Sequence, residues 1–427
     1  MPYIEEIGKP DAAVERGSMA GNPEEWTALR REIIEAFTPG TPINEADLFA
    51  GRRSAILQLQ DAALERGRHA IIYGERGVGK TSIANIFYRP LHTPTRPIHA
   101  IRVNGDRDDS FATLWLKVFR RIKHTEDGRD SWADEAHKGR VTPDDVQVEL
   151  GSFGPNELPV IIIDEFDTIE DERCKTLMTD TIKALSDYGV NCTVVLVGVA
   201  ESINELIHGH ESISRALVQV PMPRMSQAEL ADIVTARLRR SAMSIEDDAL
   251  WRITFFSAGL PFYTHSLGKH AALRAIGAHR RKVNEKDVFE AMKDCMADVD
   301  HTVKDSYVRA TERIYRKANI FAQVLAACAL ADPDSLGRYT ATSVEAPLSV
   351  IMDKPYKTES FVFHLNQLCK QERGRVLRKA GERRTFRFQF IDPLMRPYIV
   401  MKSLQDGVIT PDALNRFSVS RQRALSI

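Results

Sequence analysis

The sequence predicts an α/β protein in which a parallel-sheet core is followed by a helical domain and then by a smaller domain of helices and a β-hairpin. Three observations predict this order. Short apolar runs, such as residues 159–163 and 192–198, have the composition of strands buried on both faces and alternate with helical patterns. Residues 226–300 show helical patterns only. Residues 375–390 alternate apolar and basic side chains around an Ala-Gly-Glu turn, as a hairpin does.

The composition is that of an ordinary globular protein, with 427 residues, 43% hydrophobic and 27% charged. A chain of this length suggests roughly two to four domains. The apolar runs are far shorter than the roughly 18 residues that span a bilayer, and the first residues show no secretory signal. The five cysteines are scattered and form no C-x-x-C pair. We therefore expect no membrane partner and a reduced, cytoplasmic location.

The charge is distributed unevenly, although the net charge is only −1. Residues 301–427 carry 21 Lys and Arg against 12 Asp and Glu, whereas the rest of the chain carries 37 against 47. A basic end on an acidic body is typical of a protein that faces a polyanion with that end.

A phosphate-binding loop of the form G-x-x-x-x-G-K-[ST] begins at Gly74 and ends at Thr81. The glycines let backbone N–H groups turn toward phosphates, the lysine reaches the β- and γ-phosphates, and the threonine hydroxyl suits Mg²⁺. A chance match in a glycine-rich turn is the alternative, but a β-type stretch precedes the loop and a helical stretch follows it. We expect ATP and Mg²⁺ as cofactors, held by Gly74, Glu75, Arg76, Gly77, Val78, Gly79, Lys80, Thr81 and Ser82.

A second chemical centre follows the apolar run of residues 159–163. Asp164 at the strand end is placed to hold Mg²⁺ together with Thr81, and Glu165 is placed to orient and deprotonate water. An acid pair at a strand end is by itself most often only solvated. Together with the phosphate loop and its Lys80, however, the pair indicates a nucleoside triphosphatase core. The acidic residue Glu165, next to the predicted metal ligand Asp164, favours hydrolysis of the nucleotide over phosphoryl transfer to another substrate.

The helical segments carry clear start signals. Pro23 follows a possible N-cap, and Leu29 and Ile33 share one face of the helix after it, which suits either a packing arm or a handle for a neighbouring subunit. A capping box begins at Ser226, and Pro261 stands at a first helical position.

The C-terminal order of three helices and a hairpin is typical of a winged helix-turn-helix. Residues 370–387 hold eight Lys and Arg and two Glu. Such a wing would set basic side chains against DNA phosphates. The alternative is a solvated hairpin in a module used for protein contacts. The residues expected to contact DNA are Arg378, Lys379, Arg383 and Arg384.

Together, these motifs resemble an AAA+ ATPase. They are residues 74–81, Asp164-Glu-Phe-Asp167, the Gly198-Val-Ala strand end, Arg215, Gly259-Leu-Pro261 and the terminal winged helix. Within that family the chain resembles origin-recognition-type initiators, transposon ATP-binding helpers and STAND-type signalling ATPases.

The resemblance implies roles for individual residues. Lys80 with Thr81, and Asp164 with Glu165, would be the Walker A and Walker B residues. Arg215 would be an arginine finger that reaches the nucleotide of a neighbouring subunit, unless it is a surface arginine paired with a local acid. Arg52 would lie near the adenine, and Pro261 would approach the base from the lid.

Two departures from the family pattern stand out. Val199-Ala200 occupies the position of a polar sensor, and no sensor arginine follows Pro261, where His265 and Lys269 are the nearest basic residues. Both departures favour a slow switch over a motor.

The sequence thus predicts an ATP-hydrolysing switch that self-associates through its nucleotide interface and binds duplex DNA. The alternative is a signalling or assembly ATPase, for example in phage defence, that acts on a partner effector protein. The predicted segments are an arm and short helix (1–40), an AAA+ core (41–225), a helical lid (226–300), a winged helix (301–405) and a tail (406–427).

Overall fold

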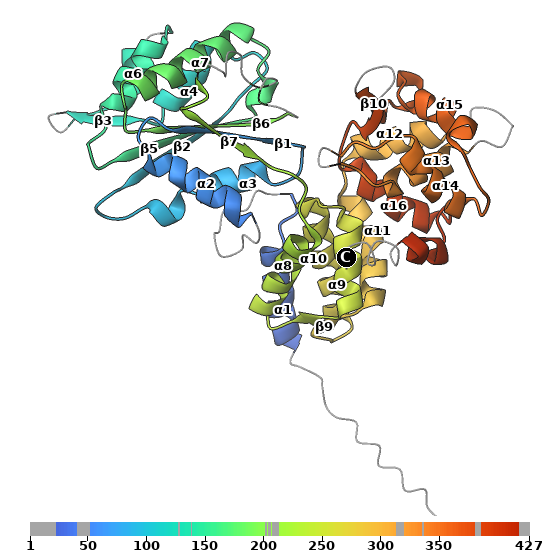
Figure 1. Cartoon of the computed structure of the whole chain (residues 1–427). Coiled ribbons are helices and arrows are strands. Elements are labelled where there is room, and N and C mark those ends of the chain that lie inside the picture. The colour runs from blue at the N-terminus through green and yellow to red at the C-terminus, as the bar shows by residue number, and fades with distance from the viewer. Residues whose placement is uncertain are drawn as a thin grey trace, which may run out of the picture.

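The computed structural model of the chain describes residues 23–40, 52–126, 129–137, 139–200, 203, 206, 213–312, 320–334, 337–380 and 386–417. The predicted arm over residues 1–21 lies outside this part of the chain. Three bodies follow one another in sequence: an α/β core, a group of helices beside it, and a C-terminal domain of helices and a hairpin (Figure 1).

The core is built on a five-stranded sheet with the order β2-β5-β6-β1-β7, and every pairing in it is parallel. The predicted parallel α/β fold is therefore confirmed. Because parallel strands end at one edge, the last residues of β1, β2, β5 and β6 lie close together. The strands are β1 (His69–Gly74), β2 (Ile98–Asn104), β5 (Leu158–Asp164), β6 (Thr193–Val199) and β7 (Leu217–Pro221).

Helices cover both faces of the sheet (Figure 1). Along each central strand, alternate side chains enter two different apolar clusters: Ile71 packs into one, and Ala70 and Ile72 pack into the other. This explains why the strands read as continuous apolar runs. One face carries α2 (Arg53–Leu64) and α3 (Lys80–Ile86), and the other carries α4 (Phe111–Phe119), α6 (Pro143–Gly151) and α7 (Glu172–Asp187).

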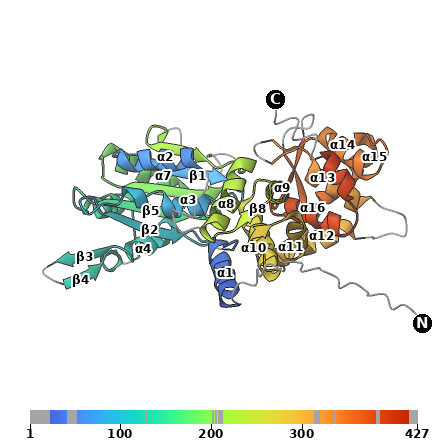
Figure 2. The same ribbon diagram turned by 90° about the horizontal axis from the view of Figure 1, so that it is seen from below.

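A β-hairpin projects from the core beyond α4, at the end far from the C-terminal domain (Figure 2). It consists of β3 (Lys123–Glu126) and β4 (Arg129–Trp132), followed by α5 (Ala133–Ala136). The sequence predicts a polar surface excursion here, without strands. The sequence of this segment is mostly polar, so it carries no apolar alternation from which the strands could be predicted.

The helical group contains four helices and a two-stranded ribbon: α8 (Gln227–Arg240), α9 (Asp247–Ser257), α10 (Pro261–Gly277), α11 (Glu285–Asp298), β8 (Ser244–Ile245) and β9 (Lys282–Val283). The predicted capping box is present, since Ser226 accepts from the backbone N–H of Glu229. The helix α1 (Pro23–Ala36) packs on α10 and α8, with Leu29 and Ile33 buried. Its apolar face therefore serves packing within the chain.

The C-terminal domain contains the predicted helices and hairpin. Its elements are α12 (His301–Thr311), α13 (Phe321–Leu330), α14 (Glu345–Ile351), α15 (Thr358–Leu368), β10 (Leu377–Ala380), β11 (Arg387–Phe390) and α16 (Met395–Gln405). Single 3-10 turns are η2 (Arg89–Leu91), η3 (Phe166–Thr168), η6 (Thr342–Val344) and η7 (Gln371–Arg373). Residues 411–417, expected in a tail, are helical, and Leu414 is buried.

One apolar cluster runs from α2 and α3 through the helical group into the C-terminal domain. The domains are therefore packed on each other rather than joined only by linkers. All five cysteines are free thiols. In the described part of the chain, no helix combines the length and the apolar character needed to cross a membrane.

Candidate nucleotide-binding site

The phosphate loop runs from the end of β1 to the start of α3, as predicted. Its glycines are required by geometry. A Cβ on Gly74 would lie 2.3 Å from the carbonyl oxygen of Met222, and Gly77 and Gly79 have φ values of 84° and 95°. Residues other than glycine rarely adopt these backbone conformations. The loop is thus curled in the form that turns N–H groups toward an anion.

Lys80 is buried at the start of α3. Its Nζ donates to the carbonyl oxygens of Gly74 and Glu75, at 2.9 and 2.7 Å. Burial lowers the pKa of Lys80 to about 8, although the nearby carboxylates of Asp167 and Asp164 act in the opposite direction. Among the described residues, the hydrogen-bond partners of this buried ammonium group are neutral carbonyls, and such a group is suited to a phosphate, which would add negative charge.

The acid pair ends β5, as predicted. The Oδ2 of Asp164 accepts from Arg102 at 2.8 Å, and its Oδ1 accepts from the backbone N–H of Glu165 at 2.9 Å. Glu165 is exposed and has a φ of 55°, a conformation that is strained for a residue with a side chain. Strained residues of this kind are concentrated at functional sites.

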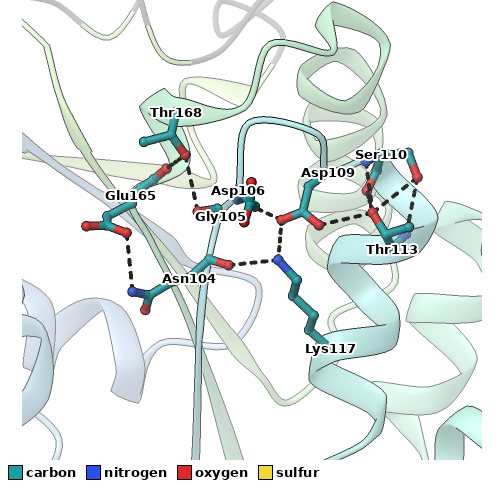
Figure 3. Close-up of polar contacts among 9 residues, drawn as sticks. All are labelled: Asn104, Gly105, Asp106, Asp109, Ser110, Thr113, Lys117, Glu165 and Thr168. Carbon is teal, nitrogen blue, oxygen red and sulfur yellow. Dashed lines mark hydrogen bonds and ion pairs between the residues drawn. The ribbon is translucent and has the colours of Figure 1, made fainter.

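Asn104 holds the Glu165 carboxylate from the neighbouring strand. The two strand ends are in register, Asn104 opposite Asp164, and the Nδ2 of Asn104 donates to Glu165 Oε2 at 3.3 Å (Figure 3). The carbonyl of Asn104 accepts from Lys117 on α4 at 3.2 Å, and Lys117 also pairs with Asp109. The carboxylate is therefore tied through a chain of polar contacts to α4.

A cavity of about 1020 Å³ lies above the loop. Pockets for small molecules and cofactors typically have volumes of about 300–1,000 Å³, so this cavity is at the upper end of that range. Residues 79–82 of the loop and α3, both members of the acid pair, and Pro261 of α10 line the cavity, together with Glu75, Arg76 and Gly77. Val78 is buried beneath the loop.

The residues that line the cavity suit a Mg²⁺ ion. Thr81 and Asp164 both line it and offer hydroxyl and carboxylate oxygens, the ligands that Mg²⁺ prefers. Within the described residues, no group of three or more His, Cys, Asp or Glu side chains forms a metal site on its own. A metal bound through few protein ligands and a nucleotide is consistent with both observations.

Arg52 lies behind the loop instead of in the cavity wall. Its guanidinium donates to the carbonyl oxygen of Pro223, and its backbone N–H donates to Glu229 at 3.1 Å. It therefore fixes the segment between β7 and α8, and the expected adenine contact stays a prediction. Residues 41–51, which include the rest of this element, lie outside the described residues.

The two sensor positions agree with the departures noted in the sequence. Val199 and Ala200 line the cavity at the end of β6. His265 also lines it, but burial lowers the pKa of His265 to about 3, so the ring is neutral near pH 7. The Nζ of Lys269 lies 3.6 Å from Asp298. Among the described residues, neither basic side chain after Pro261 offers a free cation.

The predicted finger and DNA-contacting residues are placed as follows. Arg215 is exposed just before β7. Arg378 donates to Gln389 at 2.9 Å and lines the nucleotide cavity. Lys379 is exposed, with its Nζ 5.0 Å from the centroid of Phe386. Arg383 and Arg384 lie outside the described residues.

Sequence reasoning missed Arg102, Asn104 and Arg224. Arg224 forms an ion pair of 2.6 Å with Glu75, the second residue of the phosphate loop. None of the three belongs to a local motif. Asn104 alone carried a usable indication, because it is a polar residue directly after residues 98–103, whose composition is that of a strand.

A family model for an AAA domain matches residues 63–207, the stretch that contains the loop and the acid pair. The chain carries an AAA domain. The ORC1-type DNA replication protein of Thermoplasma volcanium is 25% identical over 244 residues, which are 55% of this chain and 58% of that protein. The match thus spans little more than half of the relative's length. Residues 63–207 thus match an AAA domain, and the chain resembles AAA+ P-loop ATPases of the origin-recognition type, as the sequence motifs predict.

Three solved structures are similar over most of their length. The Aeropyrum pernix ORC1 protein in complex with DNA has a TM-score of 0.45 at 15% identity, over 88% of this chain and 96% of that one. The Aeropyrum pernix ORC2 protein has a TM-score of 0.47 at 16% identity, over 86% of this chain and 96% of that one. The Thermotoga maritima RuvB Holliday junction branch migration motor has a TM-score of 0.44 at 17% identity, over 82% of this chain and 95% of that one.

Proposed function

We propose that this AAA+ protein binds ATP with Mg²⁺ and hydrolyses it to ADP and phosphate. One observation carries the proposal: a single cavity joins Lys80 and Thr81 of the phosphate loop to Asp164 and Glu165 of β5. These are the groups that bind a triphosphate, hold its metal and activate water. ATP and ADP are the ligands that this arrangement suits.

The residues divide the work by position. Lys80 and the loop N–H groups bind the phosphates, and Thr81 and Asp164 hold Mg²⁺, which supplies positive charge beside the transferred group. Glu165 accepts the proton of the attacking water, and Asn104 orients its carboxylate. Turnover is slow, because Val199 and Ala200 bring no polar group to the end of β6.

Self-association through the nucleotide interface is part of the proposal. Arg215 is exposed and, within the described residues, its guanidinium has no hydrogen-bond or ion-pair partner. This favours the finger over a surface arginine paired with a local acid. A finger would stabilise the charge that develops on the phosphates of a neighbouring subunit.

We infer that the C-terminal domain, acting as a winged helix, brings the switch to duplex DNA. The exposed Lys379, the basic composition of the hairpin and the resemblance to a DNA replication protein support this. The second candidate is a partner protein in place of DNA. It is favoured by basic side chains that are already engaged within the chain, such as Arg387, which pairs with Asp334 at 2.8 Å.

The experiment measures ATP binding and phosphate release by the full chain. We expect Lys80→Ala to abolish binding, and Glu165→Gln to bind ATP but release no phosphate above background. Glu170→Gln, which changes an exposed glutamate outside the cavity, should leave both unchanged. Equal phosphate release by Glu165→Gln and the parent protein would refute the catalytic role.

DNA binding is measured on the same preparations. Arg383→Ala combined with Arg384→Ala should weaken duplex binding and lower the slope of log K against log salt by about 2, as expected for two lost phosphate contacts. Arg30→Ala combined with Arg31→Ala changes another adjacent pair, exposed on α1, and should have no effect. Absence of salt-sensitive binding, together with co-purification of a second protein, would support the partner alternative.

A further inference from the structure

The C-terminal domain forms part of the wall of the nucleotide cavity. Besides the AAA core and α10, the cavity is lined by Gly374 and Arg375 before β10, by Arg378 within it, and by residues 389–395. Both strands of the hairpin therefore face the phosphate loop across the same space. The loop lies in the first third of the sequence and the hairpin in the last.

The C-terminal domain also approaches the phosphate loop closely. A Cβ on Gly77 would lie 3.4 Å from the Cδ2 of Leu394, which is ordinary van der Waals contact. A Cβ on Gly337 would lie only 2.1 Å from Oε1 of Glu75, so glycine is needed there for the close approach. The hydroxyl of Tyr263 on α10 donates to the carbonyl of Leu394 at 2.5 Å.

Glu75 is fixed where these contacts meet. It pairs with Arg224 at 2.6 Å, and the two side chains are only 10% and 12% exposed. Arg224 also donates to the carbonyl of Ala258, at the start of the turn into α10. The buried ion pair thus links the loop to the segment before the helical group, and Gly337 of the C-terminal domain packs closely against it.

Arg375, just before the hairpin, differs from the described arginines on either side of it. Arg373 donates to the carbonyl of Glu312 at 2.7 Å, and Arg378 donates to Gln389. Arg375 lines the cavity, and its guanidinium has no hydrogen-bond or ion-pair partner among the described residues. Its φ of 44° follows Gly374 at 71°, so the backbone is strained at this cavity-lining residue.

The cavity therefore presents cations from two directions. Lys80 and Arg76 face it from the loop, and Arg375 faces it from the C-terminal domain. A guanidinium without a counter-ion suits a ligand with several anionic oxygens, because it can bind two of them at once.

We propose that Arg375 binds the phosphates of the nucleotide held by the phosphate loop, so that the C-terminal hairpin completes the nucleotide site within one chain. This rests on the proposed function, since it requires ATP or ADP in the cavity. A bound nucleotide then bridges the AAA core and the C-terminal domain and favours the arrangement in which the hairpin faces the loop.

The test is the affinity of the full chain for fluorescent ADP and for a fluorescent, non-hydrolysable ATP analogue. We expect Arg375→Ala to weaken binding by about 10- to 100-fold, the usual effect of losing a charged hydrogen bond. Arg375→Lys should recover only part of it, because the ammonium group lacks the bidentate geometry. Lys370→Ala removes an exposed cation of the same domain outside the cavity and should bind as the parent does.

Arg375→Gly guards against a folding defect, since glycine relieves the positive φ while removing the charge. We expect it to melt at or above the parent temperature and to bind as weakly as Arg375→Ala. Parent-like affinity in Arg375→Ala and Arg375→Gly, with binding lost in Lys80→Ala, would overturn this inference alone. A parent protein that binds neither nucleotide would overturn the proposed function as well.

Discussion

Nucleotide affinity should depend on pH through Lys80. In the free loop, burial lowers the pKa of this ammonium group from 10.5 to about 8. A bound triphosphate supplies negative charge and returns the pKa toward or above its ordinary value. The pKa is thus higher in the complex than in the free protein, so affinity is full below about pH 8 and falls as the pH rises above it.

The size of the effect follows from the free-state pKa. At pH 7 about nine tenths of the free protein carries a charged Lys80, and at pH 9 about one tenth does, while the complex stays charged at both. Affinity should therefore fall about tenfold between pH 7 and pH 9, or about 1.4 kcal/mol. Over the same range, proton uptake on binding should rise from about 0.1 to about 0.9.

The assay is calorimetric titration of a non-hydrolysable ATP analogue with Mg²⁺, in pairs of buffers that differ in ionisation enthalpy. Lys80→Arg is the matched control, because its guanidinium stays charged over this range and whatever affinity it retains should not vary with pH. Circular dichroism at each pH checks that the fold is intact. Constant affinity and no proton uptake up to pH 9 in the parent protein would refute the reasoning that burial depresses the charge of Lys80.

Three further outcomes are expected. Asn104→Ala should leave ATP binding unchanged and lower the rate of phosphate release about tenfold, because Glu165 loses the amide that orients it; an unchanged rate would exclude that role. Arg215→Ala should keep nucleotide affinity but lower the ATPase rate by roughly 10³-fold, measured at a concentration where the protein self-associates. Gly268→Ala should lower the melting temperature. The new Cβ would lie 2.6 Å from the ring of Phe37, the residue after α1, and overpacking of this kind costs about 1–3 kcal/mol. Gly277→Ala, on the same helix with nothing within 4 Å, should not lower it.

The parts of the site that the sequence predicted are those fixed by local geometry. The phosphate loop needs glycine where φ is positive, so Gly77 and Gly79 are visible as a pattern. Asp164 could be predicted because it is the first acidic residue after a continuous apolar run, and a strand that is buried on both faces ends near such a residue. These features depend on neighbours in the chain, and the structure places them as expected.

The parts that were missed depend on elements that meet only after folding. Asn104 reaches Glu165 because β2 pairs with β5 in one particular register, which no local pattern specifies. Arg224 reaches Glu75 across 149 residues. Arg378, predicted to contact DNA from the charge of the hairpin, also lines the cavity, because the packing of the domains brings that part of the hairpin to it; its DNA contact stays a prediction.

The arrangement of the hairpin constrains how any ligand of the C-terminal domain can act. If the nucleotide bridges Lys80 and Arg375, it binds more tightly when the hairpin faces the loop. Linkage is reciprocal. A DNA duplex or partner protein that moves the hairpin away from the loop must therefore weaken nucleotide binding by a certain factor, and the nucleotide must weaken the binding of that DNA or protein by the same factor. A ligand that contacts the exposed side of the hairpin and leaves Arg375 in place has no such effect. The coupling between the two ends of the protein therefore depends on whether the bound ligand moves Arg375 away from the loop, whichever ligand the C-terminal domain binds.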